Sequence, residues 1–307
     1  MRPKKHQTTG SNDLFRARLD QIINLKHELA QLADKIDWDW IDGEVAPLYS
    51  DKGRPGIETR FAIGLLLLKH IYGLSDEGVC ERWVYDPYFQ HFTGEEFFQH
   101  AFPHERSDLS HWRKRLGDEL ELLLAESLRV AHESGALRTK DLKRVTVDTT
   151  VQPKAIAFPT DAKLLHARAL PGNPYDGHTL RTVIENTQKL TGCEIERAYV
   201  DKGYRGHDAP HPRRVFISGQ KRGVFGAIKR ELRRRSAIEP VIGHMKAEGH
   251  LGRCYLKGRA GDAANAILTA AGYNFRRILA WLRMLLRPNL IALLATFPIP
   301  PTPKQAS

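Results

Sequence analysis

The sequence predicts a mixed α/β protein in which an all-helical N-terminal part precedes an α/β C-terminal part. Before about residue 138, apolar residues recur at helical spacing and no strand-like run interrupts them. After that point, β-branched residues surround a single carboxylate in Lys143–Val151, and a second strand-like run, Ile195–Val200, ends at Asp201. The 307 residues fit one large domain or two modest ones, with ample length for a buried core.

The N-terminal part begins with a basic tail, residues 1–13, that we expect to be disordered. Gly73 and Ser75 supply a helix stop followed by a helix cap, which predicts a helix-turn-helix unit. A later basic helix, opened by Ser107, places Trp112 inward and a basic side outward. The helices expected here cover about 14–36, 58–72, 76–85, the segment around His111–Arg115, and 118–134.

The C-terminal part alternates strands and helices. We expect the Asp148 strand, a helix over 178–190, strands at 195–200 and 215–217, and helices within 225–249 and 262–286. The chain then ends in a Pro-rich tail. The expected divisions are residues 1–138, 139–290 and 291–307.

Net charge is concentrated in one stretch of the chain. The total is +11, and the 58 residues of Lys202–Arg259 contain fifteen Lys or Arg against four acids, while the rest of the chain holds 32 of each. A localised excess of cations is typical of a surface that contacts a polyanion, either nucleic acid or an anionic membrane. A solvated helix face around Arg230–Arg235 is the structural alternative, and the balance elsewhere favours phosphate contact.

Several classes of protein are disfavoured by simple features. The apolar run Leu65–Leu68 is short, and Ile278–Phe297 is broken by two arginines and a proline, so neither predicts a membrane span. The polar N-terminus lacks the apolar core of a secretory signal. Three scattered cysteines form no disulfide framework. We therefore expect a cytoplasmic protein without a membrane partner.

Three carboxylates are candidates for chemistry. Asp148 and Asp201 stand at the ends of two predicted strands, and Glu239 lies on a predicted helix inside the basic stretch. Convergent carboxylates are the hard oxygen ligands that Mg²⁺ requires, and two such ions about 3.5–4 Å apart assist in-line phosphoryl displacement. Strand-end aspartates are often structural, so spacing alone indicates such a site only modestly.

Three blocks resemble the catalytic blocks of bacterial insertion-sequence transposases of the DDE class. They are Val147–Thr150, Tyr199–Gly206 and the pattern formed by Arg235, Glu239 and Lys246. The group named after the fifth insertion sequence is the most similar, and the phrases at 169–178 and 243–251 are typical of it. The tyrosine usual three residues before Arg235 is replaced by Leu232.

This resemblance implies a ribonuclease-H-like C-terminal domain after an N-terminal DNA-binding domain. It implies that Asp148, Asp201 and Glu239 bind two Mg²⁺ ions, with Mn²⁺ as an alternative. Such enzymes cut at the inverted repeats of their element and join the 3′ ends to target DNA, and we expect a homodimer on double-stranded DNA in the bacterial nucleoid. The expected DNA-binding residues are Arg235, Lys246, Lys202, Arg205, Arg233, Arg234, Arg113 and Arg115.

One segment departs from this family. A ribonuclease-H-like sheet needs two antiparallel strands after the Asp148 strand, but only the 26 residues 152–177 separate Val151 from His178, and they include four prolines. The stretch Lys163–Arg168 is interpreted as the junction of an internal deletion. We therefore expect an incomplete sheet and hypothesise low or absent activity.

Other functions compete with catalysis by a transposase. A non-catalytic DNA-binding remnant could occupy element ends and inhibit intact copies, and an unrelated Mg²⁺ nuclease could share the fold. A zinc site is disfavoured because its histidines and cysteines have unusual spacing (His244, His250, Cys254 and Cys193).

Overall fold

The computed structural model describes residues 17–49, 56–147, 164–167, 169, 175–235, 238–252, 254–256 and 258–296. The basic tail predicted at residues 1–13 and Asp148 lie outside these residues, whereas the last helix extends to Thr296 and so covers the first six residues of the tail predicted at 291–307. The elements in chain order are α1 (Leu19–Ile22), α2 (Glu28–Lys35), α3 (Trp38–Val45), η1 (Ala46–Leu48), α4 (Thr59–Tyr72), α5 (Asp76–Tyr85), α6 (Pro87–Phe92), α7 (Asp108–Leu116), η2 (Gly117–Leu120), α8 (Glu121–Glu133), α9 (Thr139–Leu142), β1 (Arg144–Thr146), η3 (Asp176–His178), α10 (Leu180–Thr191), β2 (Arg197–Val200), η4 (Lys202–Tyr204), η5 (Pro212–Arg214), β3 (Val215–Ile217), α11 (Gly226–Arg234), α12 (Ile238–Ala247) and α13 (Gly258–Thr296).

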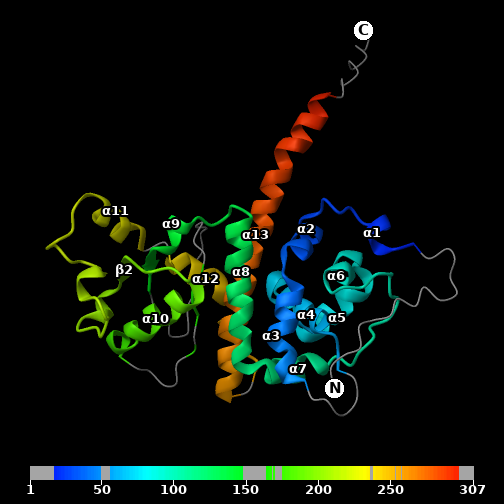
Figure 1. The fold of residues 1–307 in the computed structure, drawn as a ribbon, viewed down its shortest axis with the longest axis horizontal. Helices are drawn as coiled ribbons and strands as arrows, with labels where there is room; N and C mark the ends of the chain where they lie inside the picture. Colours follow the sequence, from blue (N-terminus) through cyan, green and yellow to red (C-terminus); the bar gives the residue numbers. More distant parts are fainter. Residues whose placement is uncertain are drawn as a thin grey trace, which may run out of the picture.

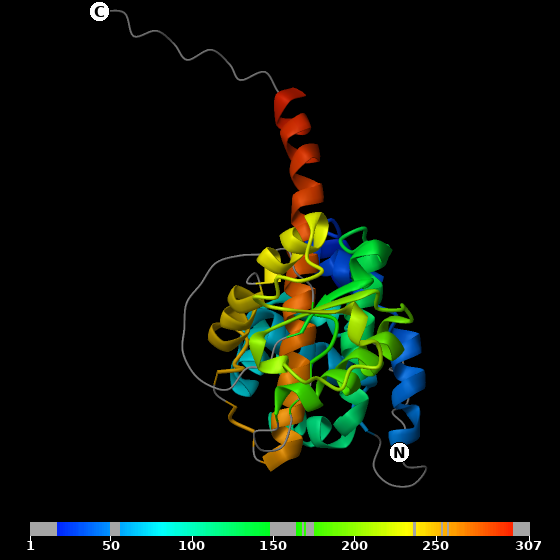
Figure 2. The same ribbon diagram turned by 90° about the vertical axis from the view of Figure 1, so that its left-hand side faces the viewer.

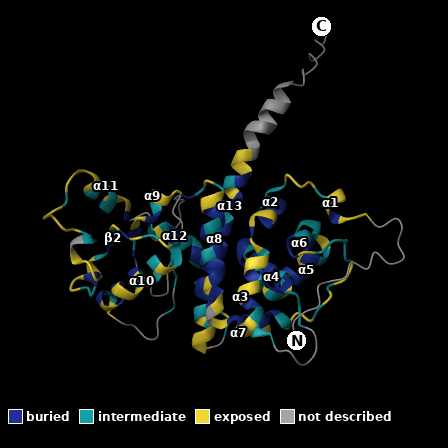
Figure 3. Ribbon diagram, in the orientation of Figure 1, coloured by how far each residue is buried: buried dark blue, intermediate teal, exposed yellow. Residues whose placement is uncertain are grey.

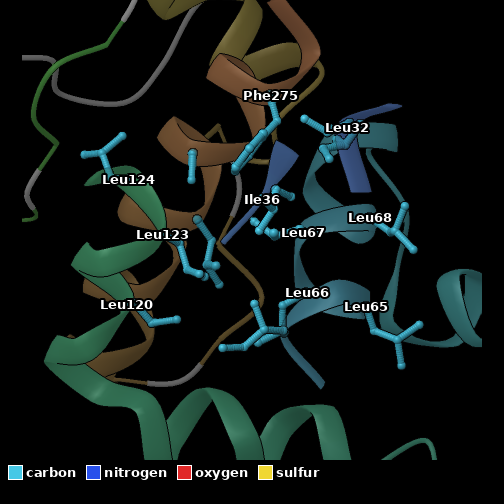
Figure 4. Close-up of a cluster of buried hydrophobic side chains, with 14 of the residues drawn as sticks. Leu32, Ile36, Leu65, Leu66, Leu67, Leu68, Leu120, Leu123, Leu124 and Phe275 are labelled. Atoms are coloured by element: carbon cyan, nitrogen blue, oxygen red, sulfur yellow. The ribbon is translucent and has the colours of Figure 1, made fainter. Parts of the chain in front are cut away.

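The helical body consists of α1 to α8 together with α13. At its centre lies α4, which is apolar on every side: Leu65, Leu66, Leu67 and Leu68 are all buried. Figure 4 shows these leucines among side chains from other helices, including Phe275 of α13. The core of this region is therefore built from segments at both ends of the chain.

The long helix α13 joins the two regions of the molecule. It packs against α8, α4 and α2, and it runs between the helices of the body and the sheet (Figures 1 and 2). At the crossing with α4, a β-carbon on Gly272 would lie 2.6 Å from His70 Cβ and 2.9 Å from the His70 backbone. Only glycine allows this approach, so α13 is fixed against α4 at this point.

The sheet region consists of β1, β2 and β3 with α10 and α11. All three strands are parallel, in the order β1-β2-β3, and Arg144, Val145 and Thr146 pair in register with Arg197, Ala198 and Tyr199. Alternate residues face opposite sides of a strand. One face carries Val145, Ala198 and Val200, which form a second core with α10. The opposite face carries Arg144, Arg197 and Tyr199.

Most predicted elements are confirmed. The fold is mostly helical with a small parallel sheet, Trp112 is buried, and Ser75 Oγ caps α5 by accepting from the Gly78 amide at 2.9 Å. Gly73 ends α4 with a left-handed φ of 63°. The single helix expected over 14–36 is wrong. Residues 23–27 break it, because Ile23 is extended and the His27 ring caps a new helix, α2.

The predicted divisions at residues 138 and 290 remain predictions, but the packing crosses the first of them. Val241 and Met245 of α12, and the buried side of α13, join the same core as α4 and α8. The sheet region is therefore flanked in sequence by segments that pack on the helical body.

Candidate active site and DNA-binding surface

Asp201 lies at the carboxyl end of the central strand. It follows Val200, the last residue of β2, and its side chain is 48% exposed. Val147, which follows β1, still lies beside β2, because its amide donates to the Tyr199 carbonyl at 2.9 Å. Val147 is the residue before Asp148 in the sequence, whereas Asp148 itself lies outside the described residues.

Glu239 lies in the first turn of α12, where a carboxylate is stabilised by the helix dipole. Pro240 follows it, and a proline is tolerated there because the amides of a first helical turn have no intrahelical partner. Lys246 lies seven residues later on the same side of α12 and is half-buried.

Arg235 brings the two described carboxylates together. Its Nη2 lies 3.4 Å from Asp201 Oδ1 and 3.8 Å from Glu239 Oε1. The guanidinium side chain is only 9% exposed, while the Glu239 side chain is 64% exposed. These separations exceed those of a strong hydrogen bond. The arrangement therefore balances two solvent-facing carboxylates with one cation while leaving their oxygens open to other ligands.

Neither a complete triad nor a zinc cluster is present in the part of the chain that the structure describes. Within it, no three His, Cys, Asp or Glu residues are grouped so that they could hold a metal ion. His244 contacts Glu248 at 2.9 Å, and His250 contacts the Gly73 carbonyl at 3.0 Å. The donor set at Asp201 and Glu239 nevertheless suits Mg²⁺, because both groups are exposed carboxylates.

Asp176 and Gly203 belong to two of the stretches that resemble transposases, and they lie against each other beside Asp201. Asp176, in the phrase that resembles insertion-sequence transposases, packs on η4, the turn that begins immediately after Asp201. A β-carbon at Gly203 would lie 2.7 Å from Asp176 Oδ2. A larger residue at Gly203 would therefore require the Asp176 side chain to move, and Asp176 supports the turn that follows Asp201.

The exposed cations lie on and around α11. Lys202, Arg205, Arg233 and Arg234 are all exposed, as the DNA-binding prediction requires, although exposure alone does not test that role. Figure 3 shows exposed residues along α11. Arg235 differs from them, because it is buried against Asp201.

The predicted contact of Arg113 with DNA does not fit its position. The Arg113 side chain is 4% exposed, and its two terminal nitrogens donate to the Asp76 carboxylate at 2.8 and 2.5 Å. It faces the interior because it lies four residues after Leu109 and three before Leu116, which are both on the buried side of α7. Arg115 is exposed and lies 5.4 Å from the Trp112 ring. We therefore remove Arg113 from the proposed DNA surface and keep Arg115.

The sequence interpretation missed Glu231. Its carboxylate accepts hydrogen bonds from Arg144, Arg197 and Tyr199, and its side chain is 14% exposed. Burial alone would raise the pKa of Glu231, but hydrogen bonds from Tyr199 and Arg144 lower it below its ordinary value. Burial and the bond to Glu231 raise the pKa of Tyr199 to about 12. The available signal was a single acid within a run of cations.

Comparison with known proteins identifies the class of this chain. Residues 17–115 match a family model described as a transposase domain (DUF772), and residues 220–279 match one described as a transposase DDE domain. The chain belongs to the transposases that carry a DDE domain. No helix among the described residues is both long and apolar enough to cross a bilayer.

One curated relative is similar over a long stretch. The "Uncharacterized protein ORF8 in nfe locus" of Rhizobium meliloti is 51% identical over 165 residues, which cover 53% of this chain and 79% of the relative. No solved structure matches the chain.

Proposed function

We propose that the protein is an insertion-sequence transposase of the group named after the fifth insertion sequence, and that Asp148, Asp201 and Glu239 form its catalytic triad. The observation that carries the proposal is the meeting of Asp201 and Glu239 at Arg235, at the carboxyl end of a parallel sheet. Family membership supplies the expectation of a divalent metal and a DNA substrate. The three carboxylates would hold two Mg²⁺ or Mn²⁺ ions.

Each side chain has a distinct task in this proposal. Bound Mg²⁺ would supply activation of the attacking oxygen and stabilisation of the leaving oxygen. Asp201 and Glu239 provide the oxygen ligands, and Arg235 neutralises them when DNA is absent. Lys246, Arg233 and Arg234 bind the phosphates of the element's inverted repeats. The fold of the catalytic domain is ribonuclease-H-like, and the protein acts on DNA as a homodimer in the bacterial nucleoid.

We also propose that an internal deletion has lowered or abolished activity. The strands of the sheet are parallel throughout the described part of the chain, and Leu164 and Ala167 pack against the helical core. Asn274 of α13 accepts from the Leu164 amide at 2.9 Å and donates to the Leu164 carbonyl at 2.8 Å. The suspected junction is therefore tied to the helical body, and this favours a DNA-binding remnant as the second candidate function.

The test is an end-cleavage and strand-transfer assay with Mg²⁺ and the element's own ends. If the site is active, Asp201→Asn and Glu239→Gln abolish turnover while DNA binding in a gel shift persists. Glu196→Gln is the matched control, because Glu196 is an exposed acid paired with Lys143 and lies away from the site. Turnover that survives Asp201→Asn contradicts the catalytic assignment.

Wild-type behaviour separates the remaining functions. Binding of element ends without cleavage supports the remnant, whereas strong turnover that disappears in Asp148→Ala contradicts the deletion hypothesis. Cleavage without joining to target DNA identifies a nuclease instead of a transposase.

A further inference from the structure

The basic helix α11 is attached to the sheet through one acidic side chain. Glu231 Oε1 accepts from Arg144 Nη1 at 2.5 Å, Glu231 Oε2 accepts from Arg197 Nη1 at 3.3 Å, and the Tyr199 hydroxyl also donates to it. No residue of α11 is fully buried. Apolar packing therefore attaches this helix only weakly to the sheet. The polar contacts of Glu231 dock it there instead.

The donors are positioned by the strand register. Arg144 of β1 pairs directly with Arg197 of β2, and Tyr199 lies two residues beyond Arg197, so the three side chains share one face of the sheet. Apolar residues of α10 cover the other face. The face toward α11 is therefore polar, because it carries Arg144, Arg197 and Tyr199. A carboxylate on α11 neutralises the two guanidinium groups of this face.

The same side of α11 leads to the candidate active site. Glu231 and Arg235 are four residues apart, so they lie on one side of the helix about one turn from each other. Arg235 contacts Asp201, which continues the strand that carries Arg197 and Tyr199. The docking of Glu231 therefore sets the position of Arg235 along the same strand.

The outward side of α11 carries only cations and small residues. Lys229, Arg230, Arg233 and Arg234 are all exposed. Lys229 and Arg233 lie opposite Glu231, Arg230 lies on the flank between the two sides, and Arg234, three residues after Glu231, lies on the side nearer to it. A helix with one side docked and the other side cationic matches the repeated negative charge of a DNA backbone.

We propose that Glu231 is a positioning residue that docks α11 on the sheet, sets Arg235 against Asp201 and presents the outer cations to DNA phosphates. The DNA part of this inference rests on the proposed function. Charge alone makes the opposite prediction, because removal of an acid from a basic helix should strengthen binding to a polyanion. The direction of the effect therefore separates the two explanations.

The experiment compares Glu231→Gln with Glu196→Gln. Both changes remove one negative charge and so raise the net charge by one, and both remove an ion pair with a neighbouring cation. We expect Glu231→Gln to bind duplex DNA with the element's end sequence roughly tenfold more weakly, the loss of about one charged hydrogen bond. Glu196→Gln should bind as well as wild type or up to about twofold more tightly. Binding by Glu231→Gln that equals or exceeds the control overturns the proposal.

Two further measurements guard against a purely structural effect. Glu231→Asp keeps the carboxylate, and the long side chains of Arg144 and Arg197 can follow it, so we expect most of the lost affinity to return. An Asp variant that binds as weakly as the Gln variant contradicts the anchoring role. The midpoint of thermal unfolding should stay within about 4 °C of wild type, since α11 contributes no buried residue.

Hydrogen exchange tests the anchor without DNA. The amides of α11 should exchange faster in Glu231→Gln and at the wild-type rate in Glu196→Gln, because only the former loses its contacts with the sheet. Unchanged exchange in α11 overturns the docking role. If wild-type protein does not bind DNA, the proposed function fails, and hydrogen exchange still decides whether Glu231 anchors the helix.

Discussion

The helical body and the sheet region use charged residues in opposite ways. In the helical body, Arg113 is buried and paired with Asp76, inside a core to which most helices contribute. In the sheet region, the core is small, and Asp201 and Arg235 meet at the carboxyl end of β2, next to Glu239 of the adjoining α12. The difference indicates that charge is used for stability in the first region, while the second leaves two carboxylates exposed to solvent, as the proposed site requires.

Breaking the buried ion pair between Asp76 and Arg113 should have the largest effect on the free energy of unfolding. Asp76→Ala leaves the Arg113 guanidinium buried without its partner, and we expect a loss of roughly 3 to 5 kcal/mol in the free energy of unfolding, measured by urea denaturation. Glu81→Ala is the control, because the Glu81–Arg106 pair is more than half exposed and should contribute less than about 1 kcal/mol. Equal effects of the two variants would contradict the contrast between buried and surface charges.

The contact that holds Leu164 on the helical body should have the next largest effect on the free energy of unfolding. Asn274→Ala removes both hydrogen bonds to the Leu164 backbone as well as the bond to Ser127 Oγ. We expect a cost of about 2 to 3 kcal/mol, because buried backbone groups are left unpaired. Ser127→Ala should cost about 1 kcal/mol, since it leaves Leu164 paired. Faster proteolysis near Leu164 in the Asn274 variant alone would show that this residue holds the segment.

Lowering the pH should reduce the free energy of unfolding of the helical body by a smaller amount. Burial alone would raise the pKa of Asp76, but the hydrogen bond from Arg113 and the charge of Lys69 lower it from 3.8 to about 2. The folded state thus favours the ionised carboxyl, so its contribution is complete above pH 4 and is lost as the pH falls toward 2. Urea midpoints measured between pH 5 and 2 should fall more steeply for wild type than for Asp76→Asn.

The sequence predicted local structure better than distant contacts. The end of α4 at Gly73 and the cap at Ser75 depend on neighbouring residues, and both are confirmed. The side chain of Ser107 makes no capping bond, although the helix begins where expected. The partners of Arg113 and Glu231 lie 32 residues or more away, so strand register and helix packing select them. Periodicity and residue type contain no information about such pairs.

Substitution of single exposed cations should have the smallest effects. The salt dependence of DNA binding in these variants should reveal which regions contact DNA. Each phosphate contact that is lost reduces the slope of log K against log salt concentration by about 1, whatever the DNA sequence. We expect Arg234→Gln in α11 to reduce this slope, measured with duplex DNA between 50 and 200 mM salt.

Arg115→Gln extends the same measurement to the helical body. A reduced slope would mean that α7 shares in DNA binding, as its exposed side predicts. Arg106→Gln is the control, since Arg106 is an exposed cation of the same region that already pairs with Glu81. A slope that changes for Arg115 and Arg234 but not for Arg106 makes DNA a ligand of both regions. If it changes only for Arg234, binding is confined to the region that holds the carboxylates, and the helical body serves stability alone.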